Sequence, residues 1–82
     1  MDKHKFLEEI YNNKKNVKFN DFIVLVKAFG FVLERTNGSH SIYKNHKINK
    51  HLNLQPKKGE AKPYQIAQFL EIVQNFNLDL ED

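Results

Sequence analysis

The chain has 82 residues, a formal net charge of +3 and no cysteine. A chain this short forms one small domain and leaves no room for a separate cofactor domain. The lack of cysteine excludes disulfides, thiolate chemistry and a cysteine-based zinc site, and it fits a reducing compartment. No stretch approaches the roughly 20 apolar residues that span a bilayer. We therefore expect a single cytoplasmic domain over residues 1–82, with no membrane contact.

Positive charge is concentrated in the middle of the chain. Residues 31–62 carry seven Lys and Arg side chains against two Glu side chains, a local charge of +5, which leaves −2 for the rest. A concentrated positive field attracts polyanions such as RNA, and the affinity it provides falls with salt. An ordinary solvated surface rich in lysine has the same composition, so charge alone does not separate the two interpretations.

A short amphipathic helix is predicted at the start of the chain. Asp2 is a good N-cap, and the helix should end near 12–13. Its apolar stripe consists of Phe6, Leu7, Ile10 and Tyr11. We interpret residues 1–13 as a helical extension and residues 20–76 as the core of the domain, with a polar connector between them.

A second amphipathic helix follows the connector. Asn20 is its expected N-cap, and Gly30 stands where a left-handed C-terminal cap is wanted. Phe19 and Val24 occupy the positions of a hydrophobic staple for a helix that is capped by Asn20. The residues at helical spacing on its apolar face are Phe22, Leu25, Val26 and Phe29.

Three strands and a last helix complete the predicted fold. The expected strands of an antiparallel meander span 31–36, 39–44 and 51–55, and Asn37-Gly38 is a strong signal for the first hairpin turn. A basic loop (57–62) leads to Pro63, which suits the first turn of a helix, and the acidic tail (77–82) is expected to fray. The apolar stripe of this helix consists of Ile66, Phe69, Leu70, Val73 and Phe76. The fold class is therefore α+β, two layers, with helices on one face of the sheet.

Four short motifs between residues 20 and 75 resemble one known family. They are Gly30-Phe31, Gly38-Ser39-His40 with Ile42-Tyr43, Leu52-Asn53-Leu54-Gln55-Pro56, and Lys62-Pro63-Tyr64-Gln65-Ile66. These motifs resemble the HicA-type toxins, small ribonucleases of bacterial and archaeal toxin–antitoxin pairs. The resemblance implies a fold like the double-stranded RNA-binding domain, cleavage of mRNA without a metal or other cofactor, and silencing by a HicB-type antitoxin. It assigns the catalytic histidine to His40.

Two positions depart from the family pattern. Many members carry a second histidine or a bulky residue directly after the catalytic one, and this chain has Ser41 there. Many also have Pro followed by His after the third strand, whereas Pro56 is followed by Lys57-Lys58. Neither departure affects His40, but both remove a neighbouring imidazole from the site.

A histidine in a basic setting can support RNA cleavage. The 2′-hydroxyl of RNA can attack the adjacent phosphate, and an imidazole that titrates near neutrality can move the proton. DNA would then be spared, and the products would end in 2′,3′-cyclic phosphates. One imidazole cannot complete both proton transfers alone. The candidates for binding and orienting the phosphate are Ser39, Tyr43, Lys44, Lys57 and Lys58.

Several alternatives stay open at this point. Strand alternation groups His40 with Ile42, but it does not tell whether this pair faces the helices or the open side of the sheet. Tyr43 and Tyr64 could stack on RNA bases or pack at the sheet rim. The set His40, His46 and His51 could bind zinc, but no carboxylate or thiolate accompanies it at a fitting spacing, so we expect no metal.

Two other functions fit the same charge pattern. The chain could be an RNA-binding module without catalysis that uses its basic face to contact shape and phosphates. It would then retain RNA in a salt-dependent way and leave it intact. The basic face could also serve mainly to bind an acidic protein partner, since electrostatic complementarity produces the same pattern.

Overall fold

The computed structural model describes residues 1–80 and contains three helices and three strands in that range. In chain order they are α1 (Lys3–Asn12), α2 (Phe19–Ala28), β1 (Val32–Asn37), β2 (His40–Asn45), β3 (Lys50–Leu54) and α3 (Pro63–Asn75). The strands form one antiparallel sheet in the order β1-β2-β3. The predicted α+β class and the predicted element order are confirmed. Within residues 1–80, no helix is long and apolar enough to cross a membrane.

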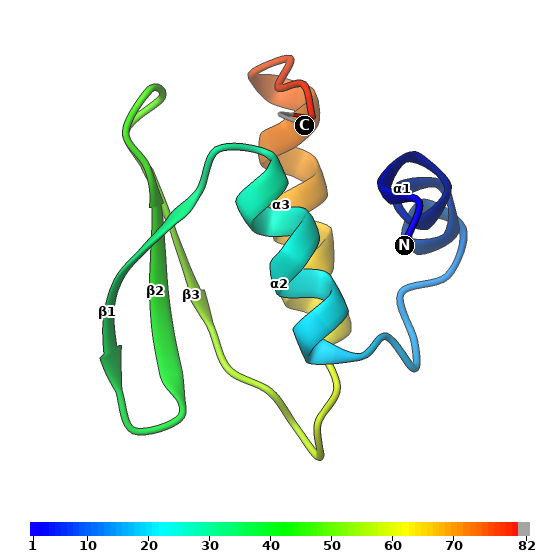
Figure 1. The fold of residues 1–82 in the computed structure, drawn as a ribbon, viewed down its shortest axis with the longest axis horizontal. Coiled ribbons are helices and arrows are strands. Elements are labelled where there is room, and N and C mark those ends of the chain that lie inside the picture. Colours follow the sequence, from blue (N-terminus) through cyan, green and yellow to red (C-terminus); the bar gives the residue numbers. More distant parts are fainter. Residues whose placement is uncertain (81–82) are drawn as a thin grey trace.

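The helices are arranged in layers beside the sheet. Figure 1 shows α2 in front of α3, with the sheet on one side of these two helices and α1 on the other, and the rings of Phe22 and Phe69 join α2 to α3. Helix α1 therefore packs on the helix layer from outside and does not cover the sheet. Ile10 of α1 is nevertheless fully buried and belongs to the same apolar cluster as the residues of α2, α3 and the sheet.

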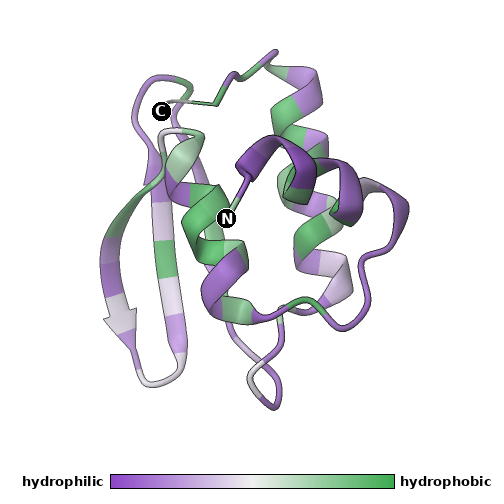
Figure 2. Cartoon of the chain, turned by 45° about the vertical axis from the view of Figure 1, so that its right-hand side comes forward, coloured by the Kyte–Doolittle hydropathy of each residue, from purple (hydrophilic) through white to green (hydrophobic). Residues whose placement is uncertain are grey.

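Phe69 of α3 lies at the centre of the core. Its ring makes edge contacts with three other phenylalanines, at centroid distances of 5.5 Å to Phe22, 5.5 Å to Phe29 and 6.1 Å to Phe31. Burying one such side chain contributes about 1.5–3 kcal/mol. The four phenylalanine rings join the two helices to the segment that enters β1. The hydropathy colouring of Figure 2 shows the apolar residues as green segments interspersed with polar ones along α2 and α3.

Of three helix caps predicted from the sequence, the structure has two at the predicted residue and one elsewhere. Asp2 caps α1, because its carboxylate accepts from the backbone N–H groups of His4 and Lys5. Gly30 follows α2 at φ 91°, in the left-handed region predicted for it. The prediction of Asn20 as the N-cap of α2 is wrong, because the helix begins at Phe19 and its N-cap is Lys18.

A neighbouring loop takes the place of the side-chain cap on α2. The N–H of Phe19 donates to the carbonyl of Gly59 at 3.0 Å, so this donor at the start of the helix is satisfied by backbone from the loop before α3. With Lys18 as N-cap, the staple positions belong to Val17 and Phe22, both buried, and not to Phe19 and Val24. The expected staple is therefore wrong by two residues.

The first hairpin turn lies one residue later than predicted. Asn37 pairs with His40, so Gly38 and Ser39 are the two turn residues. Only Gly38 has positive φ (62°) in this turn, the pattern of a type II′ turn, which places glycine first. Because the second strand begins at His40, this histidine is a paired strand residue directly after a tight turn.

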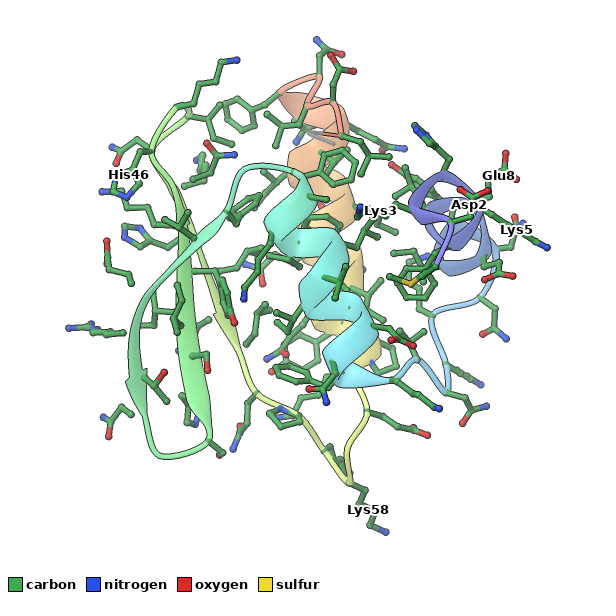
Figure 3. All side chains as sticks on the ribbon, in the orientation of Figure 1. Asp2, Lys3, Lys5, Glu8, His46 and Lys58 are labelled. Atoms are coloured by element: carbon green, nitrogen blue, oxygen red, sulfur yellow. The ribbon has the colours of Figure 1, made fainter. Side chains whose placement is uncertain are left out.

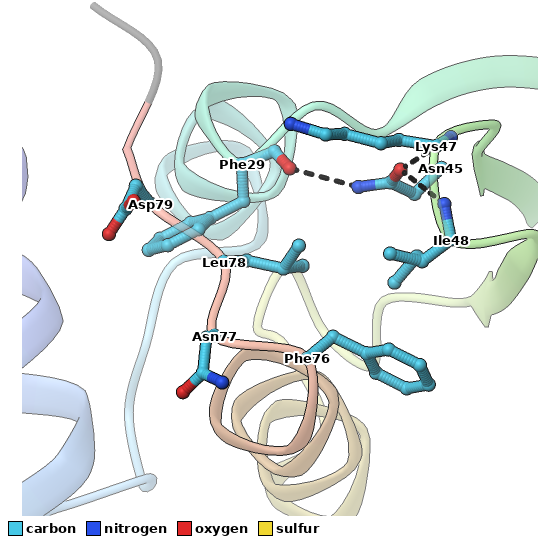
Figure 4. Close-up of a pocket in the computed structure, with 8 residues that line it drawn as sticks. All are labelled: Phe29, Asn45, Lys47, Ile48, Phe76, Asn77, Leu78 and Asp79. Carbon is cyan, nitrogen blue, oxygen red and sulfur yellow. Dashed lines mark hydrogen bonds between the residues drawn. The ribbon is translucent and has the colours of Figure 1, made fainter.

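The opposite end of the sheet is fixed by Asn45 and by the chain after α3. Figure 4 shows the Asn45 side chain donating to the carbonyl of Phe29 at 3.1 Å and accepting from the backbone of the next turn. Asn77, at φ 50°, ends α3 so that the N–H of Leu78 donates to Val73. Leu78 and Leu80 then pack against the core, so the expected fraying does not apply to residues 77–80. Residues 81–82 lie outside the described range.

Candidate nucleic-acid interface

The two faces of β2 have different surroundings. Tyr43 points toward the helices and is only 6% exposed, together with its cross-strand partner Leu52, which is fully buried. His40 is exposed and lies on the opposite face with Ile42. The alternative that the sequence left open is therefore decided, because His40 lies on the face of the sheet that α2 and α3 do not cover.

A depression on this open face surrounds His40. The residues that line it come from all three strands: Arg35, Asn37, His40, Ile42 and Asn53. The half-buried Ile42 is the one apolar member of this set, and the others carry polar side chains. An imidazole and a guanidinium thus share one hollow.

Arg35 reaches this face through a β-bulge. Leu33 pairs with Tyr43 and Arg35 with Ile42, so Glu34 is an extra residue on β1. In a regular strand Leu33 and Arg35 would share a face, because side chains alternate with period two. The bulge moves Arg35 to the open face, and sequence alternation alone gave no signal for this.

His40 is held by a side chain from the neighbouring strand. Its Nδ1 lies 3.2 Å from Oδ1 of Asn53, at hydrogen-bonding distance. Asn53 pairs with Ile42, which places it diagonally opposite His40 on the same face. Asn53 belongs to one of the four family-like motifs, but no role of its own was predicted for it.

Ser39, a predicted substrate-binding residue, belongs to a hydrogen-bonded chain at the turn. The ammonium of Lys62 donates to Oε1 of Gln55 at 3.0 Å, and Nε2 of Gln55 donates to Oγ of Ser39 at 2.8 Å. The backbone N–H of Gln55 also donates to Oε1 of the buried Gln65. Since Ser39 accepts in this chain, its own hydroxyl hydrogen is available to donate to another group.

The predicted lysines lie at different places around the site. Lys44 is on the open face of β2, four residues beyond His40, or about 13 Å at about 3.3 Å per residue. Lys57 and Lys58 are exposed in the loop before α3, which a pair of backbone hydrogen bonds between Lys57 and Glu60 closes into a tight turn. Figure 3 shows Lys58 at the tip of this loop, with its side chain directed away from the protein. None of the three lines the depression.

Tyr43 was predicted to bind the substrate, but it does not line the depression around His40. Its ring packs among the core residues on the helix side of the sheet, where it cannot stack on a base, and burial raises the pKa of its phenol. Tyr64, at the start of α3, is 65% exposed and accepts a hydrogen bond from Gln65. It is therefore the tyrosine that remains accessible for stacking.

The other histidines are not gathered around His40. Nε2 of His51 lies 3.4 Å from Oε1 of Glu34, an exposed pair. His46 lies in the turn at the far end of β2, where Figure 3 labels it. Within residues 1–80, no group of three or more His, Cys, Asp or Glu side chains is arranged to hold a metal ion. The three-histidine zinc alternative therefore has no geometric support.

Comparison with known protein families identifies the core of the chain. Residues 19–74 match the family described as the HicA toxin of bacterial toxin-antitoxin, which is more than half of the sequence. The chain belongs to the HicA toxin family. The predicted family resemblance is confirmed, and it makes the chain the toxin member of a toxin–antitoxin pair. No curated protein and no solved structure matches the chain.

The HicA family match and the site coincide. All five residues that line the depression fall inside the matched range, as do Ser39, Gln55 and Lys62. Helix α1 lies outside it, as an addition to the matched core of this HicA member. The likeness to the double-stranded RNA-binding fold stays a prediction.

Proposed function

We propose that this HicA-family toxin is a metal-independent endoribonuclease that cleaves mRNA, with His40 as its catalytic residue. The observation that carries the proposal is the position of His40 on the open face of the sheet, in a depression that it shares with Arg35. An exposed imidazole can reach a phosphodiester, and a guanidinium recognises phosphate oxygens through paired hydrogen bonds. Membership of the HicA family supports the role as a toxin. The common position of His40 and Arg35 in one depression supports cleavage of a phosphodiester.

The proposed reaction uses the RNA itself as the source of the nucleophile. His40 removes the proton from a 2′-hydroxyl, and the oxygen attacks the adjacent phosphorus. Arg35 stabilises the negative charge that develops on the phosphorane oxygens, and Ser39, directly before His40 in the chain, donates its hydroxyl hydrogen to them. The 5′-oxygen then leaves with a proton from water, and His40 returns its own proton to the solvent. The products are a 2′,3′-cyclic phosphate and a 5′-hydroxyl.

Lysines outside the depression provide affinity along the RNA strand. Lys44 continues the open face, and Lys57 and Lys58 extend from the neighbouring loop. Each phosphate contact by such a cation releases counterions, so binding should weaken as salt increases. Because these contacts are to the RNA backbone, they hold the strand without selecting a base sequence.

A comparison of RNA cleavage by the native chain and by two single-histidine variants tests the proposal. The purified chain is incubated in EDTA with RNA and with the matching DNA, next to His40→Ala and the control His46→Ala. His46 is also an exposed histidine but lies at the other end of β2. We expect RNA cleavage by the native chain and by His46→Ala, no cleavage of DNA, and a loss of about 10²–10⁴-fold in His40→Ala.

Two results would contradict the catalytic assignment. Undiminished cleavage by His40→Ala would remove His40 from the mechanism. Salt-dependent retention of RNA that stays intact on long incubation with the native chain would instead identify an RNA-binding module. Mass analysis of the cleaved ends provides a separate check, because a 2′,3′-cyclic phosphate requires the 2′-hydroxyl as the nucleophile.

We also propose that a HicB-type antitoxin silences the toxin by covering the open face of the sheet. An acidic surface on the antitoxin would complement Arg35 and the lysines around it. The measurement is RNA cleavage and RNA retention by the purified complex. We expect both to be lost in the complex. A stable complex that still cleaves RNA would show that the antitoxin binds elsewhere.

A further inference from the structure

The contact between His40 and Asn53 constrains where the imidazole carries its proton. The atom of Asn53 that faces Nδ1 is the carbonyl oxygen Oδ1, at 3.2 Å. A side-chain carbonyl can only accept a hydrogen bond, so the contact requires a hydrogen on Nδ1. The imidazolium also carries this hydrogen, so only the neutral form with its hydrogen on Nε2 would lose the contact.

We infer that Asn53 is a positioning residue that fixes the protonation pattern of His40, with the proton retained on Nδ1 and Nε2 as the nitrogen that exchanges a proton with the RNA. This inference rests on the ribonuclease function proposed above. It goes beyond it by naming the reacting nitrogen and the residue that selects it. An imidazole without such a partner can exchange between its two neutral forms, of which only one has a basic Nε2.

The sheet is well suited to hold this geometry. His40 is the first residue of β2 and pairs with Asn37, while Asn53 lies within β3 and pairs with Ile42. Both side chains therefore come from hydrogen-bonded strands, and their separation is set by the register. Sites on strands keep tighter geometry than sites on loops. Because the hydrogen bond also fixes the orientation of the ring, Nε2 presents its lone pair in a constant direction.

The protonation pattern can be read without RNA. Long-range ¹H–¹⁵N NMR of the full chain above neutral pH reports which ring nitrogen of His40 carries the hydrogen. We expect the Nδ1–H form in the native chain and a mixture of both forms in Asn53→Ala. Asn37→Ala is the matched control, since Asn37 lines the same depression and is not the hydrogen-bond partner of the ring. An Nε2–H form in the native chain, or an unchanged form in Asn53→Ala, overturns the assignment.

Kinetics add a readout that a purely structural role would not change. Asn53→Ala should lower kcat about 3- to 10-fold with little change in KM, which corresponds to one lost hydrogen bond. Asn53→Asp keeps the acceptor and should keep Nδ1–H, but its negative charge favours the imidazolium. The acidic limb of the rate against pH should therefore move to higher pH. An unchanged limb in Asn53→Asp overturns the inference.

The two proposals fail in different ways. A native chain that leaves RNA uncleaved overturns the proposed ribonuclease function. The NMR measurement decides the assignment of Asn53 separately, because it is made on the folded chain without substrate. A backbone NMR spectrum of each variant shows whether the fold is retained, so that a change in the imidazole is not confused with unfolding.

Discussion

Nε2 of Gln55 donates a hydrogen bond to Oγ of Ser39 at 2.8 Å, and this contact ties the end of β3 to the turn before His40. Gln55→Leu is the sharpest test of this tie. A leucine side chain of similar size can neither donate to Ser39, accept from its hydroxyl, nor accept from Lys62. We expect faster amide hydrogen exchange at Ser39 and His40 and a cleavage rate that is lower by a few fold.

The exchange measurement has an internal reference in the same variant. The turn between β2 and β3 lies at the other end of the sheet, and its amides should exchange at the native rate. Uniformly faster exchange would instead indicate a global loss of stability. Unchanged exchange at the first turn would show that Gly38 and strand pairing hold it without Gln55.

Arg35→Ala should reduce RNA cleavage about 10- to 100-fold, the range for losing hydrogen bonds to a charged group. Arg35→Lys should recover part of this loss, because it restores the charge but not the planar fork that matches a phosphate. The measurement is kcat/KM on a defined RNA, with Lys47→Ala as a control of equal net charge in the far turn. Equal losses in the Arg35 and Lys47 variants would reduce the role of Arg35 to general attraction.

Much of the fold could be predicted because it depends on local patterns. Apolar residues at helical spacing, Asp2, Gly30 and Pro63 fixed the order and type of the elements. The predicted cap of α2 was wrong because a backbone group from a distant part of the chain forms the hydrogen bond there. Gly59 satisfies the start of α2 in place of Asn20, and no signal within the helix indicates that partner.

The candidate site was predicted only in part, for the same reason. The Gly38-Ser39-His40 motif indicated His40 as the candidate catalytic residue, but the face of the sheet on which His40 lies depends on the pairing of whole strands. Asn53 lies thirteen residues from His40 and meets it only in this register. Arg35 needs the bulge at Glu34, and the burial of Tyr43 follows from the face it occupies.

Stability should fall at alkaline pH because of Tyr43. Burial raises the pKa of its phenol in the folded chain above the ordinary value of 10.0. Below pH 10 the phenol is neutral in both states and the stability is complete. Above it the unfolded chain releases the proton first, so stability is lost as pH rises toward the folded pKa.

Urea unfolding at pH 8 and pH 10.5 measures this effect. Tyr43→Phe should lose less stability between the two pH values than the native chain, since the phenol is gone. Tyr64→Phe is the control, because Tyr64 is 65% exposed. A native-like pH dependence in Tyr43→Phe would assign the alkaline loss to other groups.

Phe69→Ala should lower the free energy of unfolding by about 3–5 kcal/mol, because it empties the centre of the aromatic cluster. This is a large part of the about 5–15 kcal/mol that stabilises a typical domain. Phe76→Ala, on a side chain that is 41% exposed beside Lys50, should cost about 1 kcal/mol or less. Urea unfolding compares the two, and similar losses would contradict the central position of Phe69.

The bulge at Glu34 also affects how the chain behaves at high concentration. β1 is an edge strand, and its apolar residues Val32 and Leu33 are 49% and 50% exposed. A flat, apolar edge of this kind is a template for strand addition by other molecules, the first step of aggregation. The extra residue bends the strand and interrupts its regular hydrogen-bonding edge. We therefore expect this one extra residue both to bring a cation to the candidate site and to protect the toxin against self-assembly.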